Sequence, residues 1–167
     1  RLEPYTPGEQ PKERKYVKLN TNESPFQPSP KAIEMASEAS RNLQLYSDPT
    51  CSALVDALAK TYGVDRDEVL PTNGSDEILN FAFMAFPGAK GAVFPDISYG
   101  FYVVYAELHG VTYKKIPLKA DFSLDYTEYL NTDSLVVIAN PNAPTGMVVS
   151  RNEICRLLEA DRDRIVV

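Results

Sequence analysis

The chain has 167 residues, of which 44% are hydrophobic and 24% charged, a composition typical of a soluble globular protein with one sizeable core. Its formal net charge of -6 argues against nucleic acid as the main partner, because a phosphate backbone requires a basic surface. No apolar run reaches the length of a membrane span, and residues 1–5 lack the apolar segment of a signal peptide. We therefore expect a cytoplasmic protein that does not bind a membrane.

Cysteine and histidine are rare in this chain. Cys51 and Cys155 are far apart and form no Cys-x-x-Cys motif, so two buried, reduced thiols are expected rather than a disulfide. The single histidine, His109, has no partner at the spacing of zinc ligands and no nucleophile motif near it. It precedes Gly110, which predicts a position at a helix end. No metal site is predicted.

The first third of the sequence predicts an arm followed by two helices. Residues 1–16 are polar and interrupted by prolines, as in an extended arm. A helix is predicted to begin at Pro30, because proline suits the first helical turn. A second helix is predicted with Asp48 as its cap, Pro49 in its first position and Gly63 at its end.

From residue 68 onward, strand patterns alternate with helix patterns. Such alternation predicts an α/β fold, with a mostly parallel sheet between two layers of helices. The run at 135–139 is apolar throughout, as in a central strand buried on both faces. Because the sequence stops within a strand pattern at Val167, we expect a truncated domain. Strands are expected at 69–70, 92–94, 111–116, 135–139 and 165–167, and helices at 78–86, 99–109, 125–130 and 153–159.

The segment Asn73-Gly74-Ser75-Asp76 stands between a predicted strand and a helix. Gly74 permits close approach of a ligand, and the free N–H groups of a first helical turn attract anions such as phosphate. The alternative is that Ser75 and Asp76 only cap the helix. The dinucleotide fingerprint and the P-loop motif are both absent, which disfavours NAD and ATP as ligands.

Two further loops follow predicted strands, at the edge where open α/β sheets bind ligands. The first, residues 140–146, is rich in asparagine and proline, and its alternative reading is a tight surface turn. The second contains Tyr99, which could stack on a flat ring or simply pack in its own helix.

Five motifs together resemble the fold-type I aminotransferases, and within them most closely the histidinol-phosphate aminotransferases. Each motif is weak alone, but all five occur in order over residues 17–167. They are Asn22-Glu23-x-Pro25, Tyr46-x-Asp48-Pro49, Asn73-Gly74-Ser75-Asp76-Glu77, Pro95-x-x-Ser98-Tyr99 and Asn140-Pro141-Asn142-x-Pro144-Thr145-Gly146.

The resemblance implies pyridoxal 5'-phosphate as cofactor. It implies that Gly74, Ser75 and Asp76 hold the cofactor phosphate, that Tyr99 stacks on its ring, and that Tyr46 reaches the phosphate of the neighbouring subunit in a homodimer.

The resemblance also implies a place for the arm and exposes one departure. Asn22 and Glu23 are expected near the substrate. The family usually has an asparagine before Pro-Thr-Gly that bonds the cofactor's ring hydroxyl, but this chain has Ala143, and Asn142 is the candidate substitute.

No catalytic residue is expected within this segment, because the family's Schiff-base lysine would follow Val167, so the segment alone should be inactive. The resemblance implies a transaminase acting on histidinol phosphate, a phosphorylated amine, and 2-oxoglutarate, a 2-oxo acid. The alternatives are a threonine-phosphate decarboxylase, a non-catalytic phosphate-binding domain and, disfavoured, a nicotinamide-linked enzyme. We expect an arm at 1–25, a piece of a small domain at 26–46 and half of the cofactor-binding large domain at 47–167.

Overall fold

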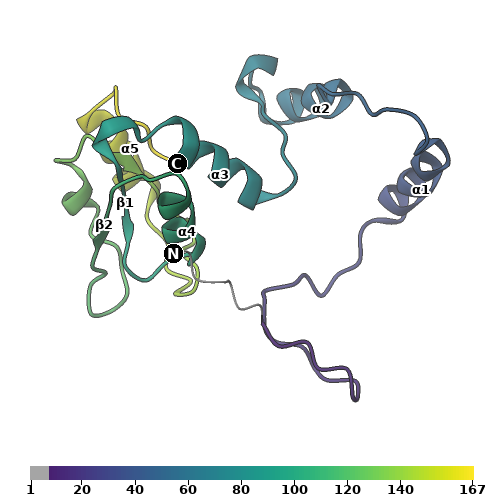
Figure 1. The fold of residues 1–167 in the computed structure, drawn as a ribbon, viewed down its shortest axis with the longest axis horizontal. Helices are drawn as coiled ribbons and strands as arrows, with labels where there is room; N and C mark the ends of the chain where they lie inside the picture. Colours follow the sequence, from purple (N-terminus) through teal and green to yellow (C-terminus); the bar gives the residue numbers. More distant parts are fainter. Residues whose placement is uncertain (1–7) are drawn as a thin grey trace. The chain divides into compact units, whose positions relative to one another are not determined.

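A computed structural model describes residues 8–167, so the first seven residues of the predicted arm lie outside the described part of the chain. The described residues form two compact units, one ending at Pro71 and the other spanning Thr72–Val167 (Figure 1). The predicted boundaries at residues 25 and 46 concern the domains of a complete protein and stay predictions.

The unit that ends at Pro71 contains two α-helices, both expected from the sequence. Helix α1 (Pro30–Ala39) begins at its proline, and the Ser29 hydroxyl caps it by accepting a hydrogen bond from the Ala32 amide. It is followed by the short 3-10 helix η1 (Ser40–Asn42). No residue of α1 is buried.

Helix α2 (Ser52–Tyr62) starts later than the sequence suggested. The Asp48 carboxylate accepts from the Ser52 amide at 2.7 Å, so it caps the helix start as predicted, but Pro49 lies before the helix rather than in its first turn. Gly63 ends the helix at a φ of 67°, as expected. The 3-10 helix η2 (Arg66–Glu68) follows.

The Thr72–Val167 unit is built on a parallel sheet with the strand order β2-β1-β3. Strand β1 (Ala92–Pro95) lies between β2 (Tyr113–Ile116) and β3 (Leu135–Val136). Val166 extends the sheet by a parallel bridge to Val136. The sequence therefore predicted the parallel sheet and the buried place of β3 correctly, although β2 and β3 are shorter than expected and β1 is one residue longer.

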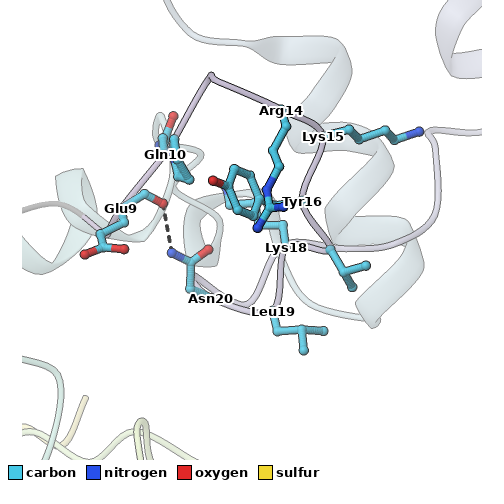
Figure 2. Close-up of a pocket in the computed structure, with 10 residues that line it drawn as sticks. Glu9, Gln10, Arg14, Lys15, Tyr16, Lys18, Leu19 and Asn20 are labelled. Carbon is cyan, nitrogen blue, oxygen red and sulfur yellow. Dashed lines mark hydrogen bonds between the residues drawn. The ribbon is translucent and has the colours of Figure 1, made fainter.

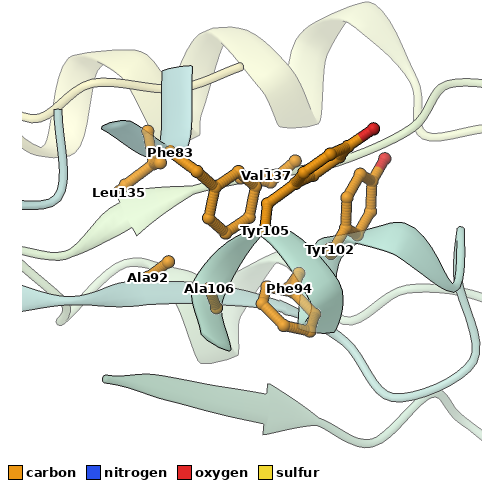
Figure 3. Close-up of a cluster of buried hydrophobic side chains, with 8 residues drawn as sticks. All are labelled: Phe83, Ala92, Phe94, Tyr102, Tyr105, Ala106, Leu135 and Val137. Atoms are coloured by element: carbon orange, nitrogen blue, oxygen red, sulfur yellow. The ribbon is translucent and has the colours of Figure 1, made fainter. Parts of the chain in front are cut away.

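Helices cover both faces of this sheet. On one face, α3 (Ser75–Ala85) and α4 (Phe101–Leu108) enclose an aromatic cluster (Figure 3). On the other face, α5 (Arg151–Ala160) and the 3-10 helix η4 (Tyr126–Tyr129) pack on alternate strand residues. The result is the predicted three-layer α/β/α architecture. The first cluster comprises Phe83, Ala92, Phe94, Tyr102, Tyr105, Ala106, Leu135 and Val137; the second comprises Val93, Ile116, Tyr129, Val136 and Leu157.

The alternation along the strands explains why both faces are dry. Ala92 and Phe94 face the first cluster, whereas Val93 between them faces the second. A strand buried on both sides cannot alternate apolar with polar residues. This is why the central strands read as continuous apolar runs.

Two expectations were wrong, whereas the short helical piece expected at 125–130 is confirmed as the 3-10 helix η4, with Asp125 as its cap and Leu130 after its end. Residues 69–70 form no strand, and Leu70 is 67% exposed. Cys51 and Cys155 are free, as expected, but both are exposed rather than buried.

Among residues 8–167, every helix is too short or too polar to cross a lipid bilayer. Over the same residues, His, Cys, Asp and Glu side chains form no group of three or more that could hold a metal ion. His109 ends α4, as predicted, and its Nε2 lies 2.8 Å from the Asn80 Oδ1 of α3.

Candidate functional site

The N-terminus of α3 is left open by its own sequence. Gly74, the residue before the helix, has a φ of 82°, which favours glycine because a side chain would be strained there. No side chain of the described chain caps this helix. The nearest carboxylate, that of Glu77, turns back to accept from the Asn73 amide at 2.7 Å. The first-turn N–H groups of Ser75 and Asp76 therefore remain available to an anion.

Helix α5 begins differently. At its start, the Ser150 hydroxyl accepts from the Glu153 amide while the Glu153 carboxylate accepts from the Ser150 amide. This capping box also lowers the pKa of Glu153 through the Ser150 hydroxyl and amide. Helix α4, like α3, follows a glycine and has no side-chain cap bond. At α3, Ser75 and Asp76 are the first two residues of the helix rather than its cap, which weakens the alternative that they serve only as helix caps.

The Asp76 carboxylate does not point to its own helix N-terminus but to two tyrosines. Its Oδ1 accepts from the Tyr99 hydroxyl at 2.6 Å and from the Tyr105 hydroxyl at 3.0 Å. A carboxylate would repel a phosphate, so the main chain of Asp76, and not its side chain, can contribute to an anion site. Two of the predicted segments, the start of α3 and the loop after β1, are thus joined directly.

The loop after β3 joins the same group through Asn142, which is 6% exposed. The Asn142 Nδ2 donates to the Ile97 carbonyl at 2.9 Å and to the Thr145 Oγ1 at 3.0 Å. Its main chain closes the turn, since the Gly146 amide donates to the Asn142 carbonyl at 2.7 Å. Ile97 precedes Tyr99 by two residues, so Asn142 ties the third predicted segment to the loop that carries the tyrosine.

One buried atom of this group has no partner within the described chain. The Asn142 Oδ1 is buried and accepts no hydrogen bond, although a buried carbonyl oxygen normally does. Both amide hydrogens of the same side chain are already donated. Asn142 can therefore serve a ligand only as an acceptor.

The sequence missed Tyr105 and the partners of Asn142. Tyr105 stands in the middle of α4, where its spacing indicates core packing, and its ring does pack on Phe83 and Phe101. Burial and the Asp76 carboxylate raise its pKa. No motif of the sequence marks a hydroxyl that reaches a residue 29 positions earlier.

The remaining predicted site residues belong to the unit that ends at Pro71. Tyr46 is fully exposed. Asn22 has a φ of 53°, in the left-handed region that asparagine tolerates better than most residues. Glu23 forms an ion pair with Lys18. The predicted roles of these three residues stay predictions.

A hollow of this unit, with a volume of about 790 Å³, is lined by residues of the arm. Figure 2 shows the Asn20 amide donating to the Glu9 carbonyl across it, at 3.0 Å. The Arg14 guanidinium lies 4.8 Å from the centre of the Tyr16 ring. None of the predicted cofactor contacts lines this hollow, whose walls are Glu9, Gln10, Pro11, Arg14, Lys15, Tyr16, Val17, Lys18, Leu19 and Asn20.

Known proteins resemble this chain over almost its full length. A histidinol-phosphate aminotransferase of Marinomonas sp. (strain MWYL1) is 53% identical over 169 residues, which cover 99% of this chain and 48% of that protein. The chain thus spans about half the length of the curated relatives it matches.

Solved structures agree in fold. Histidinol-phosphate aminotransferase from Sinorhizobium meliloti, solved with pyridoxal-5'-phosphate, superposes with a TM-score of 0.79 at 23% identity, covering 87% of this chain and 41% of that one. L-threonine-O-3-phosphate decarboxylase from Porphyromonas gingivalis superposes with a TM-score of 0.69 at 25% identity, covering 83% and 43%. The predicted fold-type I class is confirmed.

Residues 14–167 match the family described as aminotransferase class I and II. This match includes the open start of α3 and the loops after β1 and β3. The chain belongs to the aminotransferase class I and II family.

Proposed function

We propose that this chain is the N-terminal half of a pyridoxal-phosphate-dependent transaminase that moves an amino group from histidinol phosphate to 2-oxoglutarate. The observation that carries the proposal is the uncapped start of α3, which Asp76 joins to the loop after β1, while Asn142 joins that loop to the one after β3. The 53% identity to a histidinol-phosphate aminotransferase over nearly the whole chain supports the substrate.

The residues present fit the cofactor on structural grounds. An open helix N-terminus is an anion site, which suits the cofactor phosphate, and Gly74 adds no side chain that would obstruct it. The buried and unpaired Oδ1 of Asn142 is an acceptor that a hydroxyl-bearing ligand could satisfy. When bound, pyridoxal phosphate supplies an electron sink for the carbon that carries the amino group.

In this proposal the chain binds and orients the cofactor. The main chain of Gly74, Ser75 and Asp76 holds the phosphate, while Tyr99 covers one face of the ring. Tyr99 is half-buried and lies between Phe101, at 5.6 Å between ring centres, and Tyr102, at 5.8 Å. Such an aromatic setting limits the tilt of the tyrosine ring.

The role proposed for Asn142 differs from that of the family's asparagine before Pro-Thr-Gly. Since its two amide hydrogens are donated within the protein, it does not replace the missing donor at Ala143. We propose that it keeps the loop after β3 in shape and offers the ring hydroxyl an acceptor. The hydroxyl would then donate rather than accept at this contact.

The proposal extends to the parts of the site that this chain does not contain or place. A Schiff-base lysine and the arginines for cofactor phosphate and substrate would follow Val167. Tyr46 would act from the neighbouring subunit of a homodimer, and Asn22 and Glu23 would lie near the substrate. The enzyme would work in the cytoplasm.

The test uses the complete protein, purified and incubated with pyridoxal phosphate. We expect an absorbance band from the bound cofactor and amino transfer from histidinol phosphate to 2-oxoglutarate. Ser75→Ala should weaken cofactor retention by roughly 1 kcal/mol if its hydroxyl donates to the phosphate. Ser150→Ala is the matched control, because that serine caps α5 and should affect stability without affecting cofactor binding.

Two other outcomes would point elsewhere. A threonine-phosphate decarboxylase is the second candidate, favoured by the structural similarity to the P. gingivalis enzyme. It would release carbon dioxide from threonine phosphate without transferring the amino group to a 2-oxo acid. Phosphate binding with no reaction of either kind would instead support a non-catalytic phosphate-binding protein, and no binding of pyridoxal phosphate would refute the proposal.

A further inference from the structure

Helix α4 carries three aromatic side chains, Phe101, Tyr102 and Tyr105, which pack beside the candidate site. The Tyr105 ring is 6% exposed and packs on Phe83 at 5.8 Å and on Phe101 at 5.7 Å between ring centres. Figure 3 shows this ring within the aromatic cluster, with its hydroxyl at the cluster's edge. Because the ring is enclosed, the hydroxyl has one fixed position from which to donate.

That hydroxyl donates to an exposed carboxylate. Asp76 is exposed at the first turn of α3, yet its Oδ1 is held 3.0 Å from the Tyr105 hydroxyl and 2.6 Å from that of Tyr99. Burial and the neighbouring Asp76 carboxylate raise the pKa of Tyr105 above its ordinary value, so its hydroxyl keeps its proton and is a donor at neutral pH.

Helix α2 shows what a carboxylate does when it bonds to the N–H groups at a helix start. The Asp48 carboxylate accepts from the Ser52 amide at 2.7 Å and from the Thr50 amide at 2.9 Å. A carboxylate in that position occupies the N–H groups and places negative charge where an anion would bind. Asp76 stands within the first turn of α3, and its carboxylate is turned toward the two tyrosines.

We propose that Tyr105 is a positioning residue of the cofactor site: its hydroxyl holds the Asp76 carboxylate away from the first-turn N–H groups of α3 and against the Tyr99 hydroxyl. This inference rests on the proposed function. Acting through Asp76, Tyr105 keeps the phosphate position free and fixes the ring that covers the cofactor. The link runs from the enclosed Tyr105 through Asp76 to Tyr99.

The variant that tests the link is Tyr105→Phe, which removes the hydroxyl and keeps the packing ring. Its matched control is Tyr129→Phe, because Tyr129 is a buried tyrosine of the second cluster, on the other face of the sheet, and its hydroxyl has no hydrogen-bond partner within the described chain. In the complete protein, stripped of ligand, calorimetry with pyridoxal phosphate should show binding weakened about fivefold by Tyr105→Phe and unchanged by Tyr129→Phe.

A double-mutant cycle separates positioning from a general loss of packing. In an Asp76→Ala background, Tyr105→Phe should change the dissociation constant by roughly twofold or less, since the residue it acts through is gone. A merely structural tyrosine would weaken binding equally in both backgrounds. Equal effects of Tyr105→Phe and Tyr129→Phe on the dissociation constant, or an undiminished effect in the Asp76→Ala background, would overturn the inference.

A measurement without cofactor distinguishes this inference from the proposed function. In the ligand-free protein, the NMR signal of an isotope-labelled Tyr99 ring should shift in Tyr105→Phe and in Asp76→Ala but not in Tyr129→Phe. If Tyr99 responds but the wild-type protein binds no pyridoxal phosphate, the proposed function is refuted, and the site role of Tyr105 with it. If the wild type binds and Tyr99 does not respond to Tyr105→Phe, only the inference fails.

Discussion

Replacing Arg164 with alanine is expected to destabilise the sheet-containing unit by about 3–4 kcal/mol. The side chain is 6% exposed, and its guanidinium donates to four backbone carbonyls from separate parts of the unit. Nη1 donates to three of them, and Nη2 donates to the fourth, at the end of α5. The acceptors are the carbonyls of Tyr129 (2.8 Å), Leu130 (3.2 Å), Thr132 (2.7 Å) and Leu157.

The magnitude follows from the acceptors that would be left without a donor. A buried acceptor that loses its partner costs about 1–3 kcal/mol, and we take the lower value because water can reach the loop after η4. For a domain whose total stability is about 5–15 kcal/mol, this is a large fraction. Arg164→Lys should lose about half as much, since one ammonium group cannot reach all four carbonyls.

The assay is urea unfolding of the complete protein, together with hydrogen exchange at the Val137 amide, which donates to the Val93 carbonyl in the sheet. Exchange reports on this unit even if another part of the protein unfolds first. Arg162→Ala is the control, because Arg162 is exposed and stands two residues earlier. If Arg164→Ala and Arg162→Ala gave the same urea midpoint and the same protection of the Val137 amide from exchange, the hydrogen bonds from Arg164 to the four carbonyls would contribute nothing to stability, and the reasoning would be wrong.

Tyr129→Phe should raise the unfolding free energy by about 1 kcal/mol, because the Tyr129 hydroxyl is buried without a hydrogen-bond partner; a lower value in urea unfolding would contradict this. Gly91→Ala should lower it by about 3 kcal/mol, since Gly91 has a φ of 74° and an added Cβ would collide with the Thr112 carbonyl; unchanged thermal stability would exclude that strain. Glu153→Gln should remove part of the pH dependence of the unfolding free energy. Ser150 lowers the pKa of Glu153 in the folded protein, so the ionised Glu153 stabilises the fold fully above the ordinary pKa of about 4.3, and this stabilisation is lost as the pH falls through the folded pKa. Melting temperatures measured from pH 7 to pH 3 should therefore fall more steeply for the wild type than for this variant.

The sheet could be predicted because the hydrophobic pattern that indicates each strand lies within one short segment of the sequence. Residues 135–139 are apolar without interruption, and only a strand covered on both faces tolerates that pattern. Parallel strands need long connections, and α4 and α5 were visible as the segments that supply them. The layered architecture therefore followed from patterns that single segments carry, whereas the strand order came from the structure.

The ends of the helices and strands, and the short elements, could not be predicted because they depend on contacts between residues far apart in the sequence. Asp125 does cap the turn it begins, by accepting from the Thr127 amide at 3.1 Å, but the turn ends after Tyr129 because burial of that ring and the carbonyl bonds to Arg164 hold it as a 3-10 turn. Residues 69–70 have the β-branched and apolar character of a strand, yet no strand pairs with them in the described chain. Propensity gives way to tertiary contacts at such places.

At the candidate site, residue type predicted the location but not the partner of each side chain. Ser75 and Asp76 are residues that commonly cap helices, and the sequence left that reading open beside the anion site. The decisive feature is position: Gly74, not a serine, stands before α3, whereas Ser150 stands before α5 and caps it. With no side chain for the cap, and with the Asp76 carboxylate bonded to two tyrosines from α4 and its preceding loop, the start of α3 stays open for reasons distributed over three segments. Only a structure that places those segments together can distinguish a capped helix from one kept open for a ligand.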